Sequence, residues 1–324
     1  MADLDLTDAA TFGYWNTHVI RFADLDPAAH IAPVKALDSG VALRHIGRAM
    51  AGLPFIKMHG LGNDFVVIDG RATTVSLDPA WVRAVADRRS GVGCDQLVVI
   101  EPADGADARL HFRNADGSVT AACGNATRCV ARLLMAENGA DSVVIETDAG
   151  RLDCRAAAGG GITVDMGEAR FGWRDIPLAE EADTLELDLG VAGLGAAVAV
   201  SVGNPHAVFF VDDAEAVDLA RIGPGLERHA MFPERANIEI AQVNAEDRIR
   251  LRVWERGVGI TRACGSGACA TLAAAARRGL AGREAEVALD GGALAIALRD
   301  DGHVLMTGPA SESFRGTLAA EIAP

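Results

Sequence analysis

The sequence predicts an α/β (α+β) fold built from two similar halves that arose by internal duplication. Two observations support this prediction. Short β-branched runs alternate with helical stretches, and polar landmarks of the first half recur in the second half at one constant offset. The offset is 141 residues, as 264 minus 123 gives for Cys123 and Cys264, the two cysteines that precede alanine-rich stretches. Two such halves can face each other across a cleft.

The individual elements follow from local signals in chain order. Residues 1–54 show little sustained period apart from a helix-like stretch around 41–50, so we expect an N-terminal extension: a disordered arm, an upstream start or an extra element. Short apolar runs bounded by Gly, Asn and Asp then predict strands at 65–68, 97–100, 109–112 and 143–145. Helices are predicted at about 80–88 and 124–137, the second ending at Asn138-Gly139.

The second half repeats this order without a gap between landmarks. Four pairs share the offset: Asn63 with Asn204, Gln96 with Asn237, Asn114 with Glu255, and Cys123 with Cys264. The long uncharged stretch 189–211 is broken by glycines and an Asn-Pro turn, so it is interpreted as two strands and a loop rather than a membrane span. We therefore expect domains at 55–167 and 168–310, the first completed by a strand at about 311–324.

Composition narrows the class of ligand. The chain of 324 residues carries 30 basic and 45 acidic side chains, a net charge of −15, which argues against nucleic acid or anionic membrane and favours a small molecule. Only Lys35 and Lys57 are lysines, so a pyridoxal-phosphate enzyme would depend on one of these two, and we expect no cofactor. The Met1 end does not resemble a signal peptide, and six cysteines are too few for a disulfide framework, which predicts a cytoplasmic protein.

The two cysteine turns carry the strongest chemical signal. Cys123 and Cys264 each precede a glycine and a helix, so both thiols are expected at helix N-termini, where unpaired N–H groups lower a thiol pKa and bind carboxylates. Zinc is disfavoured because the next cysteines, Cys129 and Cys269, lie six and five residues further on rather than in a C-x2-C pair, and no metal is expected. Those two cysteines are expected in the core, as are Cys94 and Cys154.

A thiolate and a thiol on opposite walls of a cleft supply the base and the acid that inversion of a carbon centre requires. Helix N-termini aimed at a carboxylate would stabilise the developing carbanion. The sequence therefore predicts racemisation or epimerisation of an amino acid without pyridoxal phosphate.

Longer motifs connect these residues to a known family. They are Lys57-Met58-His59-Gly60-Leu61-Gly62-Asn63-Asp64-Phe65, Asn114-Ala115-Asp116-Gly117, Ala122-Cys123-Gly124-Asn125, Gly203-Asn204-Pro205-His206, Glu255-Arg256-Gly257 and Ala263-Cys264-Gly265-Ser266-Gly267-Ala268-Cys269. In this order they closely resemble the diaminopimelate epimerase family, from about Phe55 to the end of the chain. The resemblance implies two α/β domains, each with strands around a central helix, and interconversion of L,L- and meso-2,6-diaminopimelate for lysine and peptidoglycan synthesis.

The resemblance also implies roles for individual residues. Cys123 and Cys264 would be the acid/base pair, Glu255 would bind the reacting ammonium, and His206 would lie near the reacting centre. Donors to the reacting carboxylate would be Gly124, Asn125, Gly265 and Ser266. The rest of the substrate would be surrounded by Asn63, Gln96, Asn114, Asn204, Asn237 and Arg256.

Alternatives stay open at this point. Another two-thiol racemase acting on proline or hydroxyproline, or a non-catalytic amino-acid-binding protein, would share these turns. Two departures from the family pattern, Ala126 and the Ile238-Glu239-Ile240 run after Asn237, are interpreted as packing near the site. The sequence leaves the oligomeric state open, and a homodimer is compatible with it.

Overall fold

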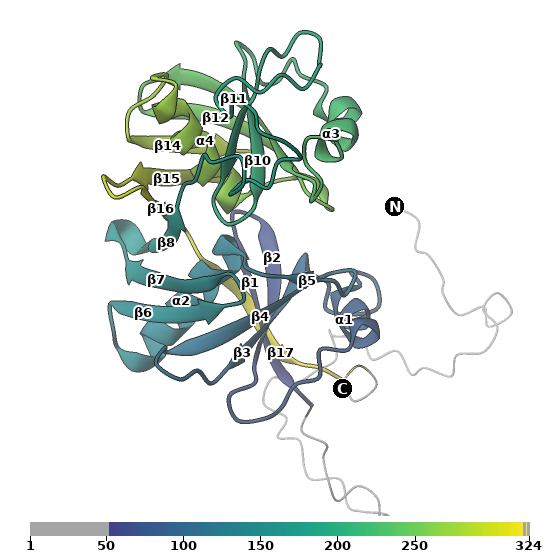
Figure 1. The fold of residues 1–324 in the computed structure, drawn as a ribbon. Coiled ribbons are helices and arrows are strands. Elements are labelled where there is room, and N and C mark those ends of the chain that lie inside the picture. Colours follow the sequence, from purple (N-terminus) through teal and green to yellow (C-terminus); the bar gives the residue numbers. More distant parts are fainter. Residues whose placement is uncertain (1–51, 320–321, 323–324) are drawn as a thin grey trace, which may run out of the picture. The chain divides into compact units, whose positions relative to one another are not determined.

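The computed structural model describes residues 52–319 and residue 322, so the predicted helix-like stretch 41–50 lies outside the described residues. The first half contains β1 (Pro54–Gly60), β2 (Asn63–Asp69), α1 (Pro79–Ala86), β3 (Gln96–Glu101), β4 (Ala108–Asn114), β5 (Val119–Thr120), α2 (Gly124–Asn138), β6 (Ser142–Thr147), β7 (Gly150–Ala156), a 3-10 turn (Ala158–Gly160) and β8 (Ile162–Glu168). The second half contains β9 (Val198–Ser201), β10 (Pro205–Phe210), α3 (Leu219–Glu227), β11 (Asn237–Ala245), β12 (Arg248–Glu255), β13 (Gly259–Thr261), α4 (Gly265–Arg277), β14 (Glu284–Leu289), β15 (Gly292–Leu298) and β16 (His303–Gly308); the last strand is β17 (Ser311–Thr317) (Figure 1).

Strand registers confirm the duplication. In the first half β2 pairs parallel with β3, and Phe65 lies opposite Gln96; in the second half β10 pairs parallel with β11, and His206 lies opposite Asn237. Each number of the second pair exceeds its counterpart by 141. The antiparallel pairs β3–β4 and β11–β12, and the parallel pairs β4–β6 and β12–β14, continue the same order.

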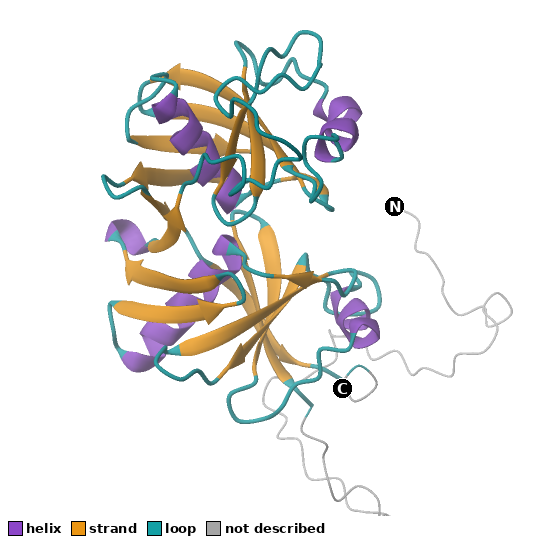
Figure 2. Cartoon of the chain, in the orientation of Figure 1, coloured by secondary structure: helices purple, strands orange, loops and turns teal. Residues whose placement is uncertain are grey.

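Each half places one long helix among its strands (Figure 2). Helix α2 packs against β1, β2, β6, β7 and β8, and α4 packs against β9 to β12 and β14 to β16. Ten residues of each helix are buried, and most of them are small or apolar. Gly139 ends α2 in the left-handed conformation, with φ of 64°, as the Asn-Gly signal predicts.

The opposite faces of the same strands bury a second layer. Side chains of β2 alternate between the two layers, because Phe65 and Val67 face the core around α2, whereas Val66 and Ile68 pack with α1. In the second half Val208 faces the inner core, and Phe209 packs with α3. Strands therefore enclose both long helices, and residues of α1 and α3 pack on the outer faces of those strands.

Two strand pairs connect segments far apart in the chain. Strand β16 pairs antiparallel with β8, which joins the two halves, and β17 returns to the first half to pair antiparallel with β1. The predicted strands at 65–68, 97–100, 109–112 and 143–145 lie within β2, β3, β4 and β6, and the stretch 189–211 contains β9 and β10 with a turn between them. Among the helices described, none is both long and apolar enough to cross a membrane.

Candidate active site

Both cysteines of interest are the N-cap residues of the central helices. Cys123 has the extended backbone of an N-cap (φ −147°, ψ 107°), and Cys264 has a similar one (φ −120°, ψ 110°). The Sγ atom of Cys264 accepts a hydrogen bond from the backbone N–H of Gly267 at 3.3 Å, as a serine would in this position. The prediction that both thiols lie at helix N-termini is confirmed.

The two helix N-termini converge on one methionine of β16. A Cβ atom added to Gly124 would lie 2.7 Å from Met306 Cε, and one added to Gly265 would lie 2.7 Å from Met306 Sδ. Real Cβ atoms do not come so close, so a larger residue at either position would displace the end of the Met306 side chain. The thiols thus start two helices that meet at Met306.

Asn125 links the two turns directly. Its side chain is buried, and Nδ2 donates to Asn63 Oδ1 at 3.2 Å in the first half and to the carbonyl of Ala263 at 3.1 Å in the second. Ala263 immediately precedes Cys264, and the Sγ atom of Cys123 lies 4.0 Å from Asn63 Oδ1. One amide therefore joins the surroundings of both thiols.

Matching residues of the two halves make matching contacts. Thr120 Oγ1 donates to Asn114 Oδ1 at 3.0 Å, and Thr261 Oγ1 donates to Glu255 Oε1. Both members of the second pair lie 141 residues after those of the first. The site thus preserves the duplicated geometry but exchanges an amide for a carboxylate, Asn114 for Glu255.

A second matched pair lies closer to the thiols. The contact of Asn125 with Asn63 corresponds to that of Ser266 with Asn204, whose Nδ2 donates to Ser266 Oγ at 3.4 Å. The direction of donation is reversed, because Asn125 donates in the first half and Ser266 accepts in the second.

The remaining predicted binding residues lie at the ends of the same strands. Gln96 Nε2 donates to Asn114 Oδ1 at 2.9 Å, while Gln96 Oε1 is buried without a hydrogen-bond partner among the described residues. Asn237 accepts from the backbone N–H of Arg256 at 2.9 Å and donates to the carbonyl of Pro205 at 3.0 Å. Arg256 is exposed, and its guanidinium donates to the carbonyl of Glu234 at 3.0 Å.

The structure revises the interpretation of Glu239. Rather than packing alone, its carboxylate lies 2.6 Å from His206 Nδ1, and both side chains are fully buried. A charged residue within the otherwise apolar stretch Ile238–Ala241 was the available signal, since a fully buried carboxylate requires a partner.

Two further residues that sequence reasoning missed support the first half. Asp95 Oδ2 accepts from Asn63 Nδ2 at 2.9 Å and holds that amide in orientation. Arg128, one turn into α2 and fully buried, donates to Asn125 Oδ1 at 2.9 Å and to the carbonyl of Pro309 at 3.3 Å. Arg128 therefore fixes the amide that joins the two turns.

Burial dominates the electrostatics of both thiols. It raises the pKa of the Cys123 thiol to about 11, although the N–H groups of Asn125 and Ala126 act in the opposite direction. Burial also raises the pKa of the Cys264 thiol well above its usual range, and the carboxylates of Glu255 and Glu239 add to the rise. The expectation of a lowered thiol pKa is wrong for the protein without substrate, because desolvation exceeds the effect of the helix N-terminus.

Glu255 is perturbed in the same way. Burial raises the pKa of its carboxyl group to about 7, against the hydrogen bonds from Thr261 and Cys264, which favour the ionised form. Its protonation therefore changes in the neutral range, where the positive charge of a bound ammonium would favour the carboxylate.

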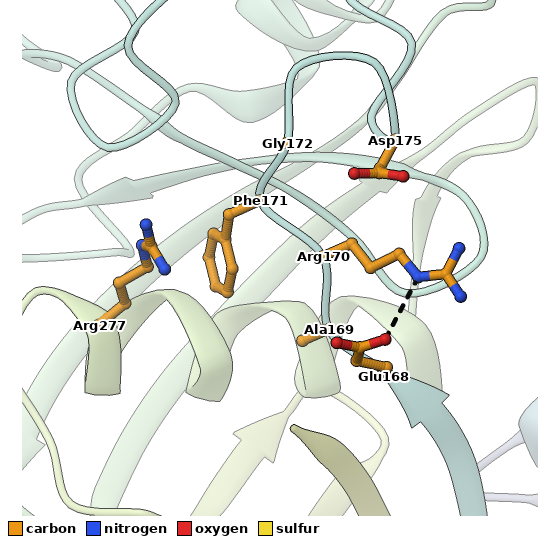
Figure 3. A pocket seen from close by; sticks show the side chains of 7 residues that line it. All are labelled: Glu168, Ala169, Arg170, Phe171, Gly172, Asp175 and Arg277. Atoms are coloured by element: carbon orange, nitrogen blue, oxygen red, sulfur yellow. Dashed lines mark ion pairs between the residues drawn. The ribbon is translucent and has the colours of Figure 1, made fainter. Parts of the chain in front are cut away.

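A separate surface cavity of about 640 Å³ involves none of the predicted site residues. It is lined by Glu168, Ala169, Arg170, Phe171, Gly172, Asp175 and Arg277 (Figure 3). Arg170 pairs with Glu168 at 3.6 Å, and the Arg277 guanidinium stacks over the Phe171 ring at 4.4 Å from its centroid. Three of its charged side chains, Glu168, Arg170 and Arg277, are thus already paired or stacked.

Comparison with known proteins assigns the family. The model of the diaminopimelate epimerase family matches residues 55–172 and 198–312. The chain belongs to the diaminopimelate epimerase family. A diaminopimelate epimerase of Rhodospirillum centenum is 59% identical over 272 residues, covering 83% of this chain and 94% of the relative. One of Acidiphilium cryptum is 56% identical over 275 residues, covering 85% and 99%.

Solved structures support the fold. A hydroxyproline epimerase from Agrobacterium vitis superposes with a TM-score of 0.63 at 18% identity, covering 84% of this chain and 94% of the other. A predicted epimerase from Pseudomonas aeruginosa superposes with a TM-score of 0.61 at 19% identity, covering 83% and 99%. At this level of identity the likeness concerns the fold alone.

Proposed function

We propose that the protein interconverts L,L- and meso-2,6-diaminopimelate by proton transfer at one α-carbon, with Cys123 and Cys264 as the acid/base pair and without a cofactor. The observation that carries this proposal is the meeting of two cysteine-capped helices at Met306, with Asn125 bonded to both turns. The epimerase relatives that align over most of the chain support diaminopimelate as the substrate.

The chemical step needs one thiolate and one thiol. The thiolate takes the α-hydrogen as a proton, and the electron pair of the broken C–H bond delocalises into the α-carboxylate. The other thiol then delivers its proton to the opposite face of the carbon. The configuration is inverted, the two sulfur atoms have exchanged protonation states, and no other reactant is consumed.

The helix N-termini would stabilise the intermediate. Backbone N–H groups of Gly124 and Asn125 on one helix, and of Gly265 and Ser266 on the other, are the first donors after each cysteine. Because unpaired N–H groups at a helix start favour negative charge, they would stabilise the carboxylate most strongly when it carries the additional charge of the carbanion.

Glu255 would bind the ammonium of the reacting end. Its pKa of about 7 in the empty site would fall when the ammonium is bound, which leaves a carboxylate paired with a cation. This ammonium would also favour the thiolate form of the nearby cysteines, because it opposes the desolvation that raises their pKa values.

The distal end of the substrate would meet the polar residues at the strand ends. The buried Oε1 atom of Gln96, which has no hydrogen-bond partner among residues 52–319 and 322, could accept from an ammonium, and Arg256 offers a planar guanidinium to a carboxylate. The complete set proposed for this end is Asn63, Gln96, Asn114, Asn204, Asn237 and Arg256.

Hydrogen exchange in heavy water tests the reaction. Incubation with L,L-diaminopimelate should place deuterium at an α-carbon and yield the meso form, measured by NMR and chiral chromatography. Proline and hydroxyproline are the necessary comparisons, because a hydroxyproline epimerase shares this fold. Labelling of proline or hydroxyproline, with diaminopimelate unlabelled, would overturn the substrate assignment; ligand binding without exchange would indicate a binding protein.

We further propose that the enzyme acts in the cytoplasm and forms a homodimer. A mass of about twice 33.7 kDa by light scattering would support the dimer, and a mass near 33.7 kDa would contradict it.

A further inference from the structure

A chain of polar contacts runs from a buried carboxylate to one reactive thiol. Glu239 Oε1 lies 2.6 Å from His206 Nδ1, and His206 Nε2 lies 2.8 Å from Asn204 Oδ1. Asn204 Nδ2 donates to Ser266 Oγ at 3.4 Å, and Ser266 Oγ lies 3.6 Å from Cys264 Sγ.

The direction of donation along this chain follows from the atoms involved. Both ring nitrogens of His206 face oxygen atoms that accept, a carboxylate oxygen and an amide oxygen. Burial raises the pKa of the Glu239 carboxyl group, and the neighbouring His206 lowers it. When Glu239 is ionised, His206 donates at both nitrogens, which only the imidazolium form can do. With its oxygen occupied by His206, the Asn204 amide donates to Ser266, and the Ser266 hydroxyl is left to donate to Cys264.

Glu239 is the counter-ion that this arrangement needs. His206 and Glu239 are both fully buried, and an imidazolium in such a place is stable only beside an anion. The second oxygen of Glu239, Oε2, has no hydrogen-bond partner among the described residues, so the contact with His206 is its main interaction. Other titratable groups near this pair are Glu255 and Cys264.

Glu239 also lies beside the Cys264 turn. A Cβ atom added to Gly267 would lie 3.0 Å from Glu239 Oε1 and 3.2 Å from Cys264 Sγ, so the carboxylate and the thiol border the same glycine. At the matching positions of the first half stand Val98 and Phe65, 141 residues before Glu239 and His206. The His206–Glu239 pair therefore lies on the Cys264 side and has no counterpart on the Cys123 side.

We propose that Glu239 is a positioning residue for the epimerisation: it holds His206 as an imidazolium and thereby turns the Ser266 hydroxyl toward Cys264. The proposal rests on the function proposed above. If His206 were neutral and its one proton lay on Nδ1 beside Glu239, its Nε2 would accept, the Asn204 amide would present its nitrogen to the ring, and its oxygen would accept the Ser266 hydroxyl proton in place of Cys264. The state of a carboxylate that does not touch substrate would thus determine whether Cys264 receives a hydrogen bond.

The direct test observes His206 in the protein without substrate. Histidine labelled with ¹⁵N, with His206 assigned by a His206→Gln variant, should show imidazolium chemical shifts for His206 at pH 7.5. Glu239→Gln should convert the ring to the neutral form at the same pH. Because no turnover is measured, this result is independent of the substrate assignment; a neutral His206 in the unmodified protein would overturn the proposal.

Kinetics test the consequence. Loss of one hydrogen bond to the reacting sulfur corresponds to roughly a tenfold change in rate, so Glu239→Gln should lower kcat about tenfold and change KM less than about twofold. Ser266→Ala removes the last member of the chain, and adding Glu239→Gln to it should cause little further loss of kcat. Independent, multiplicative losses in the double variant would contradict the chain.

Glu227→Gln provides the matched control. Glu227 is a second buried carboxylate of the same half, and it accepts from Trp254 Nε1 and the backbone N–H of Gly257. This change should lower stability yet leave the His206 chemical shifts in place. Glu239→Asp retains the charge and should keep His206 protonated; a Glu239→Asp protein with neutral His206 would count against an ion pair as the cause.

Discussion

The two cysteine turns share a backbone but differ in the charges behind them. On the Cys123 side a buried cation, Arg128, stands one turn into the helix, and the matching position in the other helix is Cys269. On the Cys264 side stand Glu255 and Glu239, where the first half has Asn114 and Val98. Duplication thus supplied two equivalent helix N-termini, and a few substitutions made one side cationic and the other acidic. A substrate with one reacting end requires such inequality.

Replacing either thiol should have the largest effect. Cys123→Ala and Cys264→Ala should each lower kcat about a thousandfold or more, because inversion needs both a base and an acid. Steady-state conversion of L,L-diaminopimelate measures this loss. Cys269→Ala, a buried cysteine of α4, should retain activity and lose about 1 kcal/mol of unfolding free energy. Full activity in Cys123→Ala or in Cys264→Ala would show that the two thiols do not act together as base and acid.

Making the second half resemble the first is the next test. Glu255→Asn copies Asn114, keeps an acceptor for Thr261 and removes the charge, so kcat/KM should fall about a hundredfold. In the unmodified enzyme kcat/KM should rise as pH increases through about 7, since Glu255 must be ionised to bind the ammonium. That acidic limb should disappear in Glu255→Asn; if it persists at the same pH, another group causes it.

Ionisation of Glu255, which should raise kcat/KM, should lower the stability of the folded protein. Its pKa is higher in the folded state, about 7 against 4.5, so the folded protein holds the proton between these values. The unfolding free energy should therefore fall as pH rises from about 4.5 to about 7, by roughly 3 kcal/mol from this group. Urea unfolding of the unmodified protein and of Glu255→Gln should diverge across that range, and parallel curves would contradict the shift.

Removing the cation of the first half should have a moderate effect. Arg128→Met keeps a long side chain but leaves Asn125 Oδ1 without its donor, at a cost of about 2 kcal/mol in unfolding free energy. We expect kcat to fall about tenfold as the amide that joins the two turns loses its orientation. Arg128→Lys restores a donor and should recover part of both quantities, measured by urea unfolding and kinetics; no recovery would point to packing alone.

The smallest expected difference is in thiol reactivity. Cys123 keeps some exposed surface, whereas Cys264 is buried beside two carboxylates whose charges oppose its ionisation. Iodoacetamide should therefore modify Cys123 several-fold faster than Cys264, and the rate should increase with pH because the thiolate reacts. Peptide mapping by mass spectrometry gives both rates. Equal rates would mean that the charges behind the turns do not distinguish the thiols.

Local signals explain what the sequence could predict. The strand runs, the Asn-Gly helix end and the cysteine N-caps are encoded by neighbouring residues, and the offset of 141 extended them to the second half. The ion pair of His206 with Glu239 joins residues 33 apart, and Asn125 meets Ala263 138 residues away. Such contacts depend on strand register and on packing between distant segments, so the sequence alone does not predict them. The thiol pKa values were misjudged for the same reason, because burial is a property of the whole fold. The proposed domain division at residue 168 stays a prediction.

The pairing of β1 with β17 has a consequence for biosynthesis. Strand β1 leaves the ribosome about 250 residues before its partner β17 is made, and the first half lacks that strand until the second half has been synthesised. Until then the unpaired N–H and C=O groups on this edge of β1 could pair with other nascent chains. Molecular chaperones would therefore be needed most at this edge. Assembly of the first catalytic half is thereby delayed until the second half has been synthesised.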